Sequence, residues 1–526
     1  MKKPLILDCT LRDGGYINRW RFGRNVIQDI IAKLGQADVD IIECGFLRDV
    51  PYDEEVSVFS CVSQIATLIA PKRENTLYVA MIAVGDILPE KILPFDGTSI
   101  DGIRLTFHKH EWEETRTAAL ELMAKGYKVF VQPVGTTSYS DAELLHLMED
   151  VNILHPYAFY LVDTLGIMYR HDLLRMFYLI DNNLEHDIRV GFHSHNNLQL
   201  SFANAQELLR MDSKREIILD ASVYGMGRGV GNLATELLAE YINKNIDQRY
   251  RLIPLLSIAD QHLMSIYAEQ RWGYDLPYFL SAVEKCHPNY AAHLLKKETL
   301  NIEDISKILS LLPAEKRDLY HPELIEELYL SMQRCQVDDS ELLNRLRAEI
   351  SGRVVLIMGP GATMKTHGDS IERYIVEQRP YVVSINFFTE SLPTDMIFIS
   401  NRKRIKTLRE HSDLISRVIA TSNLRQDATQ LKQFVNYANY LGEGQAADNA
   451  GAMLIRVLKQ AEVSYIALAG FDGFDTDLKN NYCIDSYKRQ LEYKDAIRKN
   501  EEIARQIRLA LGDTPYTFIT PTRYSI

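Results

Sequence analysis

The chain has 526 residues, of which 46% are apolar and 25% are charged, and its formal net charge is −12. At roughly 100 to 200 residues per domain, this length predicts two to four domains with their own cores. The negative charge excludes a nucleic-acid-binding surface spread over the whole molecule, although a local anion site stays open. We find no apolar run of about 18 residues that predicts a membrane span. Six cysteines without regular spacing favour a reduced, cytoplasmic protein.

The first half of the chain alternates strand-like and helix-like segments. The predicted strands are Leu5–Asp8, Asp40–Cys44, Leu77–Val84, Gly102–Thr106, Tyr127–Gln132, Ala158–Asp163, Ile188–His193 and Glu216–Ala221. The predicted helices are Asn25–Leu34, Val56–Ile69, Glu111–Ala124, Asp141–Val151, Asp172–Asn182, Leu198–Leu209 and Leu233–Asn243. Strands followed by helix-length connections indicate an α/β fold, a parallel (β/α)8 TIM barrel over residues 1–250. An open doubly wound sheet is the alternative.

The second half is predicted to contain a helical extension, residues 251–350, and a second α/β domain, residues 351–526. Helical periodicity covers Ile253–Gln270, Leu276–Lys285, Tyr290–Leu295, Ile302–Leu312, Pro322–Gln333 and Ser340–Ile350. Strands are then expected at Arg353–Met358, Tyr381–Phe387, Met396–Ser400, Ser416–Thr421 and Ser464–Ala469, with helices at Ala450–Gln460 and Asp485–Leu511. The pattern predicts an open three-layer domain.

Polar residues gather where the predicted barrel strands end, which is where the chemistry of such barrels is located. They are Asp8, Arg12, Asp13, Glu43, Arg104, Thr106, Gln132, Asp163, Thr164, His193 and His195. His193 and His195 are two residues apart on an extended segment, so their side chains point to the same side. A carboxylate with two histidines suits a divalent transition metal, while paired histidines at a strand end are also common as plain polar loop residues.

A glycine-rich segment follows the last barrel strand, from Gly225 to Asn232, and leads into a helix. Such a segment can bind phosphate at the helix N-terminus, or it can bring Asn232 to a metal. Its spacing is not that of a P-loop.

Three motifs together resemble a known family. Asp8-Cys-Thr-Leu-Arg-Asp-Gly, Gly191-Phe-His-Ser-His-Asn-Asn and Gly229-Val-Gly-Asn-Leu-Ala-Thr-Glu resemble the signatures of metal-dependent lyase and aldolase barrels. That family includes 3-hydroxy-3-methylglutaryl-CoA lyase, 2-isopropylmalate synthase and 4-hydroxy-2-oxovalerate aldolase. The resemblance covers about residues 4–245 and is greatest to the aldolase branch. It implies that Asp13, His193 and His195 bind a divalent metal, Mn or Mg before Co or Zn. It also implies that Asn232 is a further ligand and that Arg12 stabilises an enolate oxygen.

The sequence departs from the aldolase branch at Tyr16, where those aldolases carry a histidine that transfers a proton. A phenol with an ordinary pKa of about 10 is a poor base at neutral pH. Tyr16 therefore acts as an acid, positions substrate, or leaves the base to another residue, with His108 and His110 as the nearest candidates. We expect a carbon–carbon lyase that joins or splits a pyruvate-type enolate and an aldehyde. The alternatives are Claisen-type condensation with an acyl-CoA, and a non-catalytic nucleotide- or sugar-binding regulatory protein.

The C-terminal domain carries a second candidate site. Gly359-Pro360-Gly361 after a buried strand could cradle a phosphate or be a simple bend. With Asn386 and Gly451 it faintly resembles Rossmann-like domains of bacterial surface-sugar transferases, which implies a nucleotide or nucleotide-sugar bound near Gly359, Gly361, Asn386 and Gly451. The expected partners are a small 2-oxo acid, an aldehyde and this nucleotide ligand, with no nucleic acid and no membrane. Homo-oligomer formation stays open.

Overall fold

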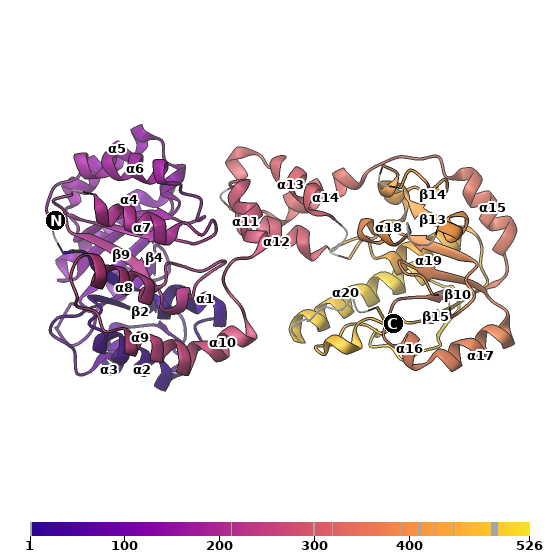
Figure 1. The fold of residues 1–526 in the computed structure, drawn as a ribbon, viewed down its shortest axis with the longest axis horizontal. Helices are drawn as coiled ribbons and strands as arrows, with labels where there is room; N and C mark the ends of the chain where they lie inside the picture. The colour runs from indigo at the N-terminus through magenta and orange to yellow at the C-terminus, as the bar shows by residue number, and fades with distance from the viewer. Residues whose placement is uncertain are drawn as a thin grey trace. The chain divides into compact units, whose positions relative to one another are not determined.

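The computed structural model describes residues 3–211, 213–297, 300–317, 319–389, 391–408, 412–426, 428–444, 446–484 and 493–526. The chain divides into two compact units (Figure 1). One contains Met1–Ala292 and Leu312–His321, and the other contains His293–Leu311 and Pro322–Ile526. The boundary thus falls within the predicted helical extension, whose helices contribute to both units.

The first unit is a closed parallel barrel. Its strands are β1 (Leu5–Asp8), β2 (Ile41–Leu47), β4 (Leu77–Ala83), β5 (Gly102–Phe107), β6 (Lys128–Pro133), β7 (Ala158–Asp163), β8 (Arg189–Ser194) and β9 (Ile217–Ala221). They pair in the order β1-β9-β8-β7-β6-β5-β4-β2, and a β1–β2 pairing closes the ring. The predicted TIM barrel is confirmed, and the open sheet is excluded for this unit.

Helices cover the outside of the barrel (Figure 1). They are α2 (Arg24–Gln36), α3 (Val62–Ile69), α4 (Trp112–Ala124), α5 (Asp141–Leu154), α6 (Arg170–Asn183), α7 (Ser201–Arg210) and α8 (Thr235–Asn245). The strands are buried on both faces, because the helices cover one face and residues such as Leu7, Val79, Phe130 and Tyr160 fill the interior. The unit continues through α9 (Leu252–Ile258), a π-helical turn (Ala259–Leu263), α10 (Met264–Glu269) and α11 (Leu276–Val283), and α12 (Pro288–Lys296) spans its boundary.

One predicted helix of the barrel was wrong at its start. The prediction began at Val56, whereas Val58–Phe59 form a short strand, β3, that pairs with the end of β2. The apolar pair is buried against β2, and this pairing overrides the helical periodicity.

The second unit contains a parallel sheet in the order β14-β13-β12-β11-β10-β15-β16. Its strands are β10 (Val354–Met358), β11 (Tyr381–Ile385), β12 (Met396–Ile399), β13 (Val418–Thr421), β14 (Phe434–Val435), β15 (Tyr465–Ala469) and β16 (Tyr516–Phe518). The helices are α13 (Ile302–Ser310), α14 (Pro322–Gln333), α15 (Ser340–Ile350), α16 (Thr363–Thr366), α17 (Gly368–Gln378), α18 (Arg402–Leu408), α19 (Ala450–Gln460) and α20 (Tyr493–Leu511). The strands β14 and β16 were not predicted, and residues 485–492 of the last predicted helix lie outside the described residues.

Two apolar clusters show the layers of this second unit. One face of the sheet packs on α15, α19 and α20, with Leu346, Leu454 and Ile507 buried there. The other face packs on α17 through Ile371. A parallel sheet between two helical layers is an α/β domain, as predicted, and its Rossmann-like character stays a prediction. Within the described part of the chain, no helix combines the length and apolar character needed to cross a membrane.

Candidate metal centre

The turn after β1 presents Arg12 and Asp13 at the carboxyl end of the barrel. It is one π-helical turn, Thr10–Gly14, and every residue in it is buried. The Trp20 indole N–H donates to the Arg12 carbonyl at 2.7 Å, and the Ser57 hydroxyl donates to the Leu11 carbonyl at 2.6 Å. π-helical turns are rare and frequent at functional sites. This one is fixed from outside by side chains of neighbouring segments.

Asp8, at the end of β1, has a structural role. Its carboxylate accepts hydrogen bonds from the Thr10 backbone N–H at 3.0 Å and from the Thr235 hydroxyl at 2.6 Å. Burial raises the pKa of Asp8 to about 6. Asp8 therefore ties the turn to α8 and is not part of the metal-ligating cluster.

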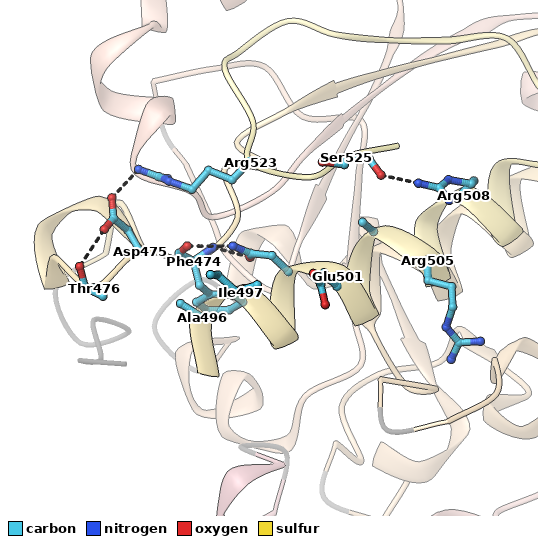
Figure 2. Close-up of a pocket in the computed structure, with 12 residues that line it drawn as sticks. Phe474, Asp475, Thr476, Ala496, Ile497, Glu501, Arg505, Arg508, Arg523 and Ser525 are labelled. Atoms are coloured by element: carbon cyan, nitrogen blue, oxygen red, sulfur yellow. Dashed lines mark hydrogen bonds and ion pairs between the residues drawn. The ribbon is translucent and has the colours of Figure 1, made fainter. Parts of the chain in front are cut away.

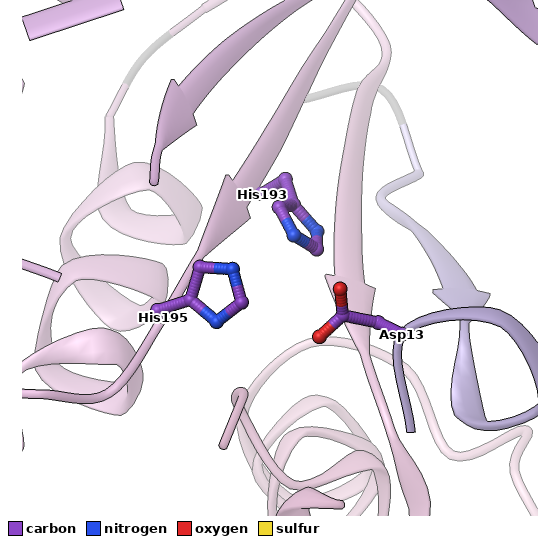
Figure 3. Close-up of side chains that lie close together, drawn as sticks. All are labelled: Asp13, His193 and His195. Atoms are coloured by element: carbon purple, nitrogen blue, oxygen red, sulfur yellow. The ribbon is translucent and has the colours of Figure 1, made fainter. Parts of the chain in front are cut away.

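Asp13, His193 and His195 form a compact cluster (Figure 3). One potential ligand atom from each side chain lies within 4.8 Å of the others. Figure 3 shows the two imidazoles on one strand end facing the carboxylate on the turn. Burial lowers the pKa of His195 to about 4, so its imidazole is neutral at pH 7 and offers a lone pair. The three residues that the sequence singled out as ligands are thus together.

Asp220, on β9, orients one of these histidines. The Nδ1 atom of His193 lies 2.9 Å from the Asp220 carboxylate, which leaves the other ring nitrogen of His193 for a ligand. A carboxylate behind a metal-binding histidine fixes the tautomer and raises the basicity of the ring. Sequence reasoning missed Asp220. The available signal was a charged residue inside an otherwise apolar barrel strand, Ile-Ile-Leu-Asp-Ala.

Buried ion pairs link Asp13 to Asp220 around the barrel. Arg12 donates to Asp13 at 2.7 Å and to Glu43 at 2.8 Å. Arg104, fully buried, lies 2.9 Å from the same Glu43 oxygen and also donates to Asp220. Burial is the largest single effect on Asp13 and Asp220 and opposes their ionisation. Arg12 with the neighbouring histidines and Asn232 outweighs it at Asp13, and Arg104 with His193 outweighs it at Asp220, so both pKa values lie below the usual range. We refer to Asp13, Arg12, Glu43, Arg104 and Asp220 as the charge chain.

The glycine-rich loop brings Asn232 against the cluster. The Asn232 amide nitrogen donates to Asp13 at 2.6 Å and to the Met226 carbonyl at 3.2 Å. A Cβ atom on Gly227 would lie 2.3 Å from that amide nitrogen, so only glycine allows this approach. Asn232 also forms a backbone bridge with His195. The loop therefore brings Asn232, the predicted further ligand, into contact with Asp13.

Several buried polar atoms around the cluster lack a hydrogen-bond partner within the described residues. They are Arg12 Nη2, Gln132 Oε1, His195 Nδ1, Asn197 Oδ1 and Asn232 Oδ1. Each such atom costs roughly 1 to 3 kcal/mol when it is left unpaired, so a group of them marks a place where ligands bind. Two imidazoles, a carboxylate and a free amide oxygen also suit a divalent ion chemically. The residues present therefore fit a divalent metal.

Tyr16 and His108 have different surroundings. Tyr16 lies in α1 (Gly15–Asn18), is 40% exposed, and its ring lies 4.8 Å from that of Trp20 and 5.8 Å from the guanidinium of Arg228. His108 is exposed in the turn after β5, where its backbone N–H donates to Glu111 at 2.6 Å. Within the described residues, no recorded contact joins the His108 side chain to the cluster. Tyr16 thus contacts the glycine-rich loop that carries Asn232, and within the described residues no such contact is recorded for His108.

In the second unit, three of the predicted ligand-binding residues share one cavity. Gly361, Asn386 and Gly451 line a cavity of about 170 Å³ beyond the carboxyl ends of β10, β11 and β15. Gly359 precedes it at the end of β10, where its N–H donates to the Ala469 carbonyl at 2.8 Å. Asn449 lines the same cavity and caps α19 by accepting from the Ala452 N–H.

Fold and cluster define a class: a TIM barrel with a candidate divalent-metal centre at the carboxyl ends of its strands. Residues 96–261 match the HMGL-like family model. The chain is 27% identical to 4-hydroxy-2-oxovalerate aldolase of Roseiflexus castenholzii over 46% of its own length and 72% of the relative. It is 24% identical to oxaloacetate decarboxylase of Mycobacterium tuberculosis over 46% of this chain and 71% of the relative.

A solved structure agrees with this assignment. The N-terminal domain of an aldolase candidate from Bacteroides vulgatus superposes with a TM-score of 0.50 at 25% identity. It covers 58% of this chain and 99% of that domain. The sequence and structure comparisons therefore agree on the barrel.

Proposed function

We propose that the barrel is a divalent-metal-dependent carbon–carbon lyase of the aldolase type. Its substrate is a 2-oxo acid that yields, or is formed from, a pyruvate-type enolate and an aldehyde. The single observation that carries this proposal is the Asp13–His193–His195 cluster with an unpartnered Arg12 nitrogen beside it. The relatives support a carbon–carbon lyase, since their names describe an aldolase and a decarboxylase.

In this proposal Asp13, His193 and His195 hold the metal, and Asn232 supplies a further oxygen. A bound divalent ion polarises a carbonyl oxygen and makes the neighbouring C–H bond more acidic. Arg12 uses its free Nη2 to donate to the substrate oxygen that gains negative charge. Its other nitrogens are already committed to Asp13 and Glu43, so the guanidinium is held in place before substrate binds.

Proton transfer is assigned to Tyr16 in this proposal. Its position at the barrel opening, beside Arg228, supports a role as the acid that protonates the aldehyde oxygen when the carbon–carbon bond forms. In the cleavage direction the same group takes that proton back from the hydroxyl. Tyr16→Phe keeps the ring that packs on Trp20 and removes only the hydroxyl. We expect this variant to bind metal normally and to lose most of its aldol turnover, by roughly 10²- to 10⁴-fold.

The test uses the half-reaction on pyruvate alone. We expect the full-length protein to exchange the methyl protons of pyruvate in heavy water, followed by NMR, when supplied with Mn²⁺ or Mg²⁺, with Co²⁺ and Zn²⁺ compared. A chelator and the variants His193→Ala and His195→Ala should abolish the exchange. His155→Ala is the matched control, because His155 is an exposed histidine paired with Asp187 at 3.0 Å. Exchange that persists without metal, or that is absent with every metal, refutes the proposal. Release of free CoA from an acyl-CoA would support the Claisen alternative instead.

We also propose that the C-terminal unit binds a nucleotide or nucleotide-sugar. In open parallel sheets, ligands bind beyond the carboxyl ends of strands where the strand order reverses. Here β10 lies between β11 and β15, and the cavity lined by Gly361, Asn386 and Gly451 lies at that point.

Two neighbouring cavities support a larger, anionic ligand. One, of about 590 Å³, is lined by Arg505, Arg508 and Arg523 and shares Phe474 with the first cavity (Figure 2). Another, of about 290 Å³, is lined by Lys365 and also by Arg523. Cationic side chains next to a cavity at the switch point suit phosphate groups.

Calorimetric titration with nucleoside diphosphates, nucleoside monophosphates and nucleotide-sugars tests this second proposal. A Cβ atom on Gly361 would lie 2.5 Å from the Gly470 carbonyl oxygen, so Gly361→Ala should weaken binding. Gly368→Ala is the control, because its added Cβ meets no atom within 4 Å. No binding of any nucleotide by the wild type, or equal affinity in the two variants, contradicts the proposal.

A further inference from the structure

Arg228 is a cation at the barrel opening that no carboxylate within the described residues neutralises. It lies on the glycine-rich loop whose other end, Asn232, contacts Asp13. Its guanidinium lies 5.8 Å from the Tyr16 ring, and its Nη2 atom lies 2.9 Å from Nε2 of His287. Apart from these two contacts, no hydrogen bond, ion pair or ring contact is recorded for its side chain in the described part of the chain.

Arg228 shares His287 with a second hydrogen-bond donor. The Asn289 backbone N–H also points at this imidazole, 3.2 Å from its Nδ1 atom. A neutral imidazole has one acceptor nitrogen and one N–H, whereas a guanidinium can only donate. The ring cannot accept from both donors, so the Arg228 side chain and the Asn289 N–H compete for one acceptor nitrogen.

The surroundings of the loop connect Arg228 with the metal-ligating cluster. A Cβ atom on Gly229 would lie 3.1 Å from the Tyr278 ring and 3.5 Å from the unpartnered Asn197 Oδ1. Arg228 therefore lies on the loop that contacts the cluster through Asn232, while its own side chain is exposed.

Resting on the proposed function, we infer that Arg228 is a specificity-determining residue that binds an anionic group, a carboxylate or a phosphate, on the aldehyde half of the substrate. The 2-oxo acid half already has a buried donor, Arg12, next to the cluster. An exposed guanidinium farther out, next to Tyr16, matches the second half of the substrate, where the aldehyde would approach. Guanidinium groups bind carboxylate and phosphate with paired hydrogen bonds, and both belong to the same anionic class.

The experiment compares matched aldehydes in the addition to pyruvate by the full-length, metal-loaded enzyme. Glyceraldehyde 3-phosphate is paired with glyceraldehyde, and glyoxylate is paired with acetaldehyde. The first pair tests recognition of a phosphate, and the second pair tests recognition of a carboxylate. The wild type should favour one anionic partner over its neutral counterpart, and Arg228→Leu should lower that kcat/KM ratio by about tenfold to a hundredfold. Arg228→Lys should restore part of it, since the charge returns without the paired donors.

Arg210→Leu serves as the control, because Arg210 is 62% exposed on α7 and its only recorded partner in the described part of the chain is a long contact to Glu207. An unchanged anion-to-neutral ratio in Arg228→Leu overturns the inference. If none of the four aldehydes reacts, calorimetric binding of glycerol 3-phosphate and of glyoxylate in the presence of Mn²⁺ and pyruvate decides. Equal affinities in wild type and Arg228→Leu then overturn it. Loss of wild-type pyruvate exchange instead overturns the proposed function, so the two failures are distinguishable.

Discussion

Asp220→Asn is the sharpest test of how the charge chain supports the metal centre. The Asp220 oxygen that accepts from His193 at 2.9 Å also accepts from Arg104. The other Asp220 oxygen has no hydrogen-bond partner within the described residues, so an amide that turns its nitrogen to that side keeps both hydrogen bonds. It removes the negative charge that His193 and Arg104 each face.

The expected size follows from what each loss costs. Removing the carboxylate behind a metal-binding histidine typically weakens metal affinity by about 10- to 100-fold. Leaving one partner of a buried ion pair uncompensated costs roughly 3 to 5 kcal/mol, and Glu43 remains next to Arg104 to limit this. We therefore expect Mn²⁺ affinity to fall by at least about tenfold and the barrel to be destabilised by about 3 kcal/mol.

Calorimetric titration of the metal-free protein with Mn²⁺ measures the first effect, and urea unfolding of the same metal-free protein measures the second. Asp187→Asn is the matched control, because Asp187 makes the same type of histidine pair at 3.0 Å but is 71% exposed. Asp220→Asn with wild-type Mn²⁺ affinity would refute the view that His193 depends on Asp220. Unchanged unfolding would refute the cost assigned to Arg104.

Three further outcomes follow from the same contacts. Burial and then Arg228 lower the pKa of His287 to about 4, so Arg228→Leu should raise that pKa, as measured by NMR titration of labelled histidine. The unfolded chain protonates His287 at a higher pH than the folded protein does, so the wild type should lose stability as the pH falls from about 6.5 towards 4. The variant should lose less stability over this range. Gly227→Ala should weaken Mn²⁺ binding in calorimetry, since its Cβ would lie 2.3 Å from the Asn232 amide. Burial raises the pKa of Asp163 to about 6, so its contribution to stability should fall by about 3 kcal/mol as the pH rises from 4 to 6. Asp163→Asn should remove this contribution in urea unfolding, while the similar contribution of Asp8 remains.

The barrel could be predicted from sequence because its strands are buried on both faces. Such strands appear as short apolar runs that end in a polar residue, and Leu5–Asp8 and Ala158–Asp163 were predicted with the bounds that the structure has. The failures were short strands. Val58–Phe59, Phe434–Val435 and Tyr516–Phe518 are two or three residues long, and only pairing with a neighbour makes them strands.

The residues that form the candidate metal cluster could be predicted from the sequence, whereas Asp220, which orients one of them, could not. Asp13, His193 and His195 were found because their residue types and motif positions carry the metal chemistry, and the structure brings them together. Asp220 was not found, because its importance depends on strand register. β8 and β9 pair Phe192 with Leu219, so the next residue on each strand, His193 and Asp220, are neighbours. No local pattern contains that information.

The charge chain also has a consequence for the order of binding. Asp13, Glu43 and Asp220 contribute three formal negative charges and Arg12 and Arg104 two positive ones, so these five residues together carry −1. A divalent ion changes this to +1, and the carboxylate of a 2-oxo acid then brings it to zero. The buried charges therefore sum to zero only when the divalent ion and the substrate carboxylate are both bound. We expect the cation and the carboxylate to bind with positive cooperativity, each raising the affinity for the other by the same factor.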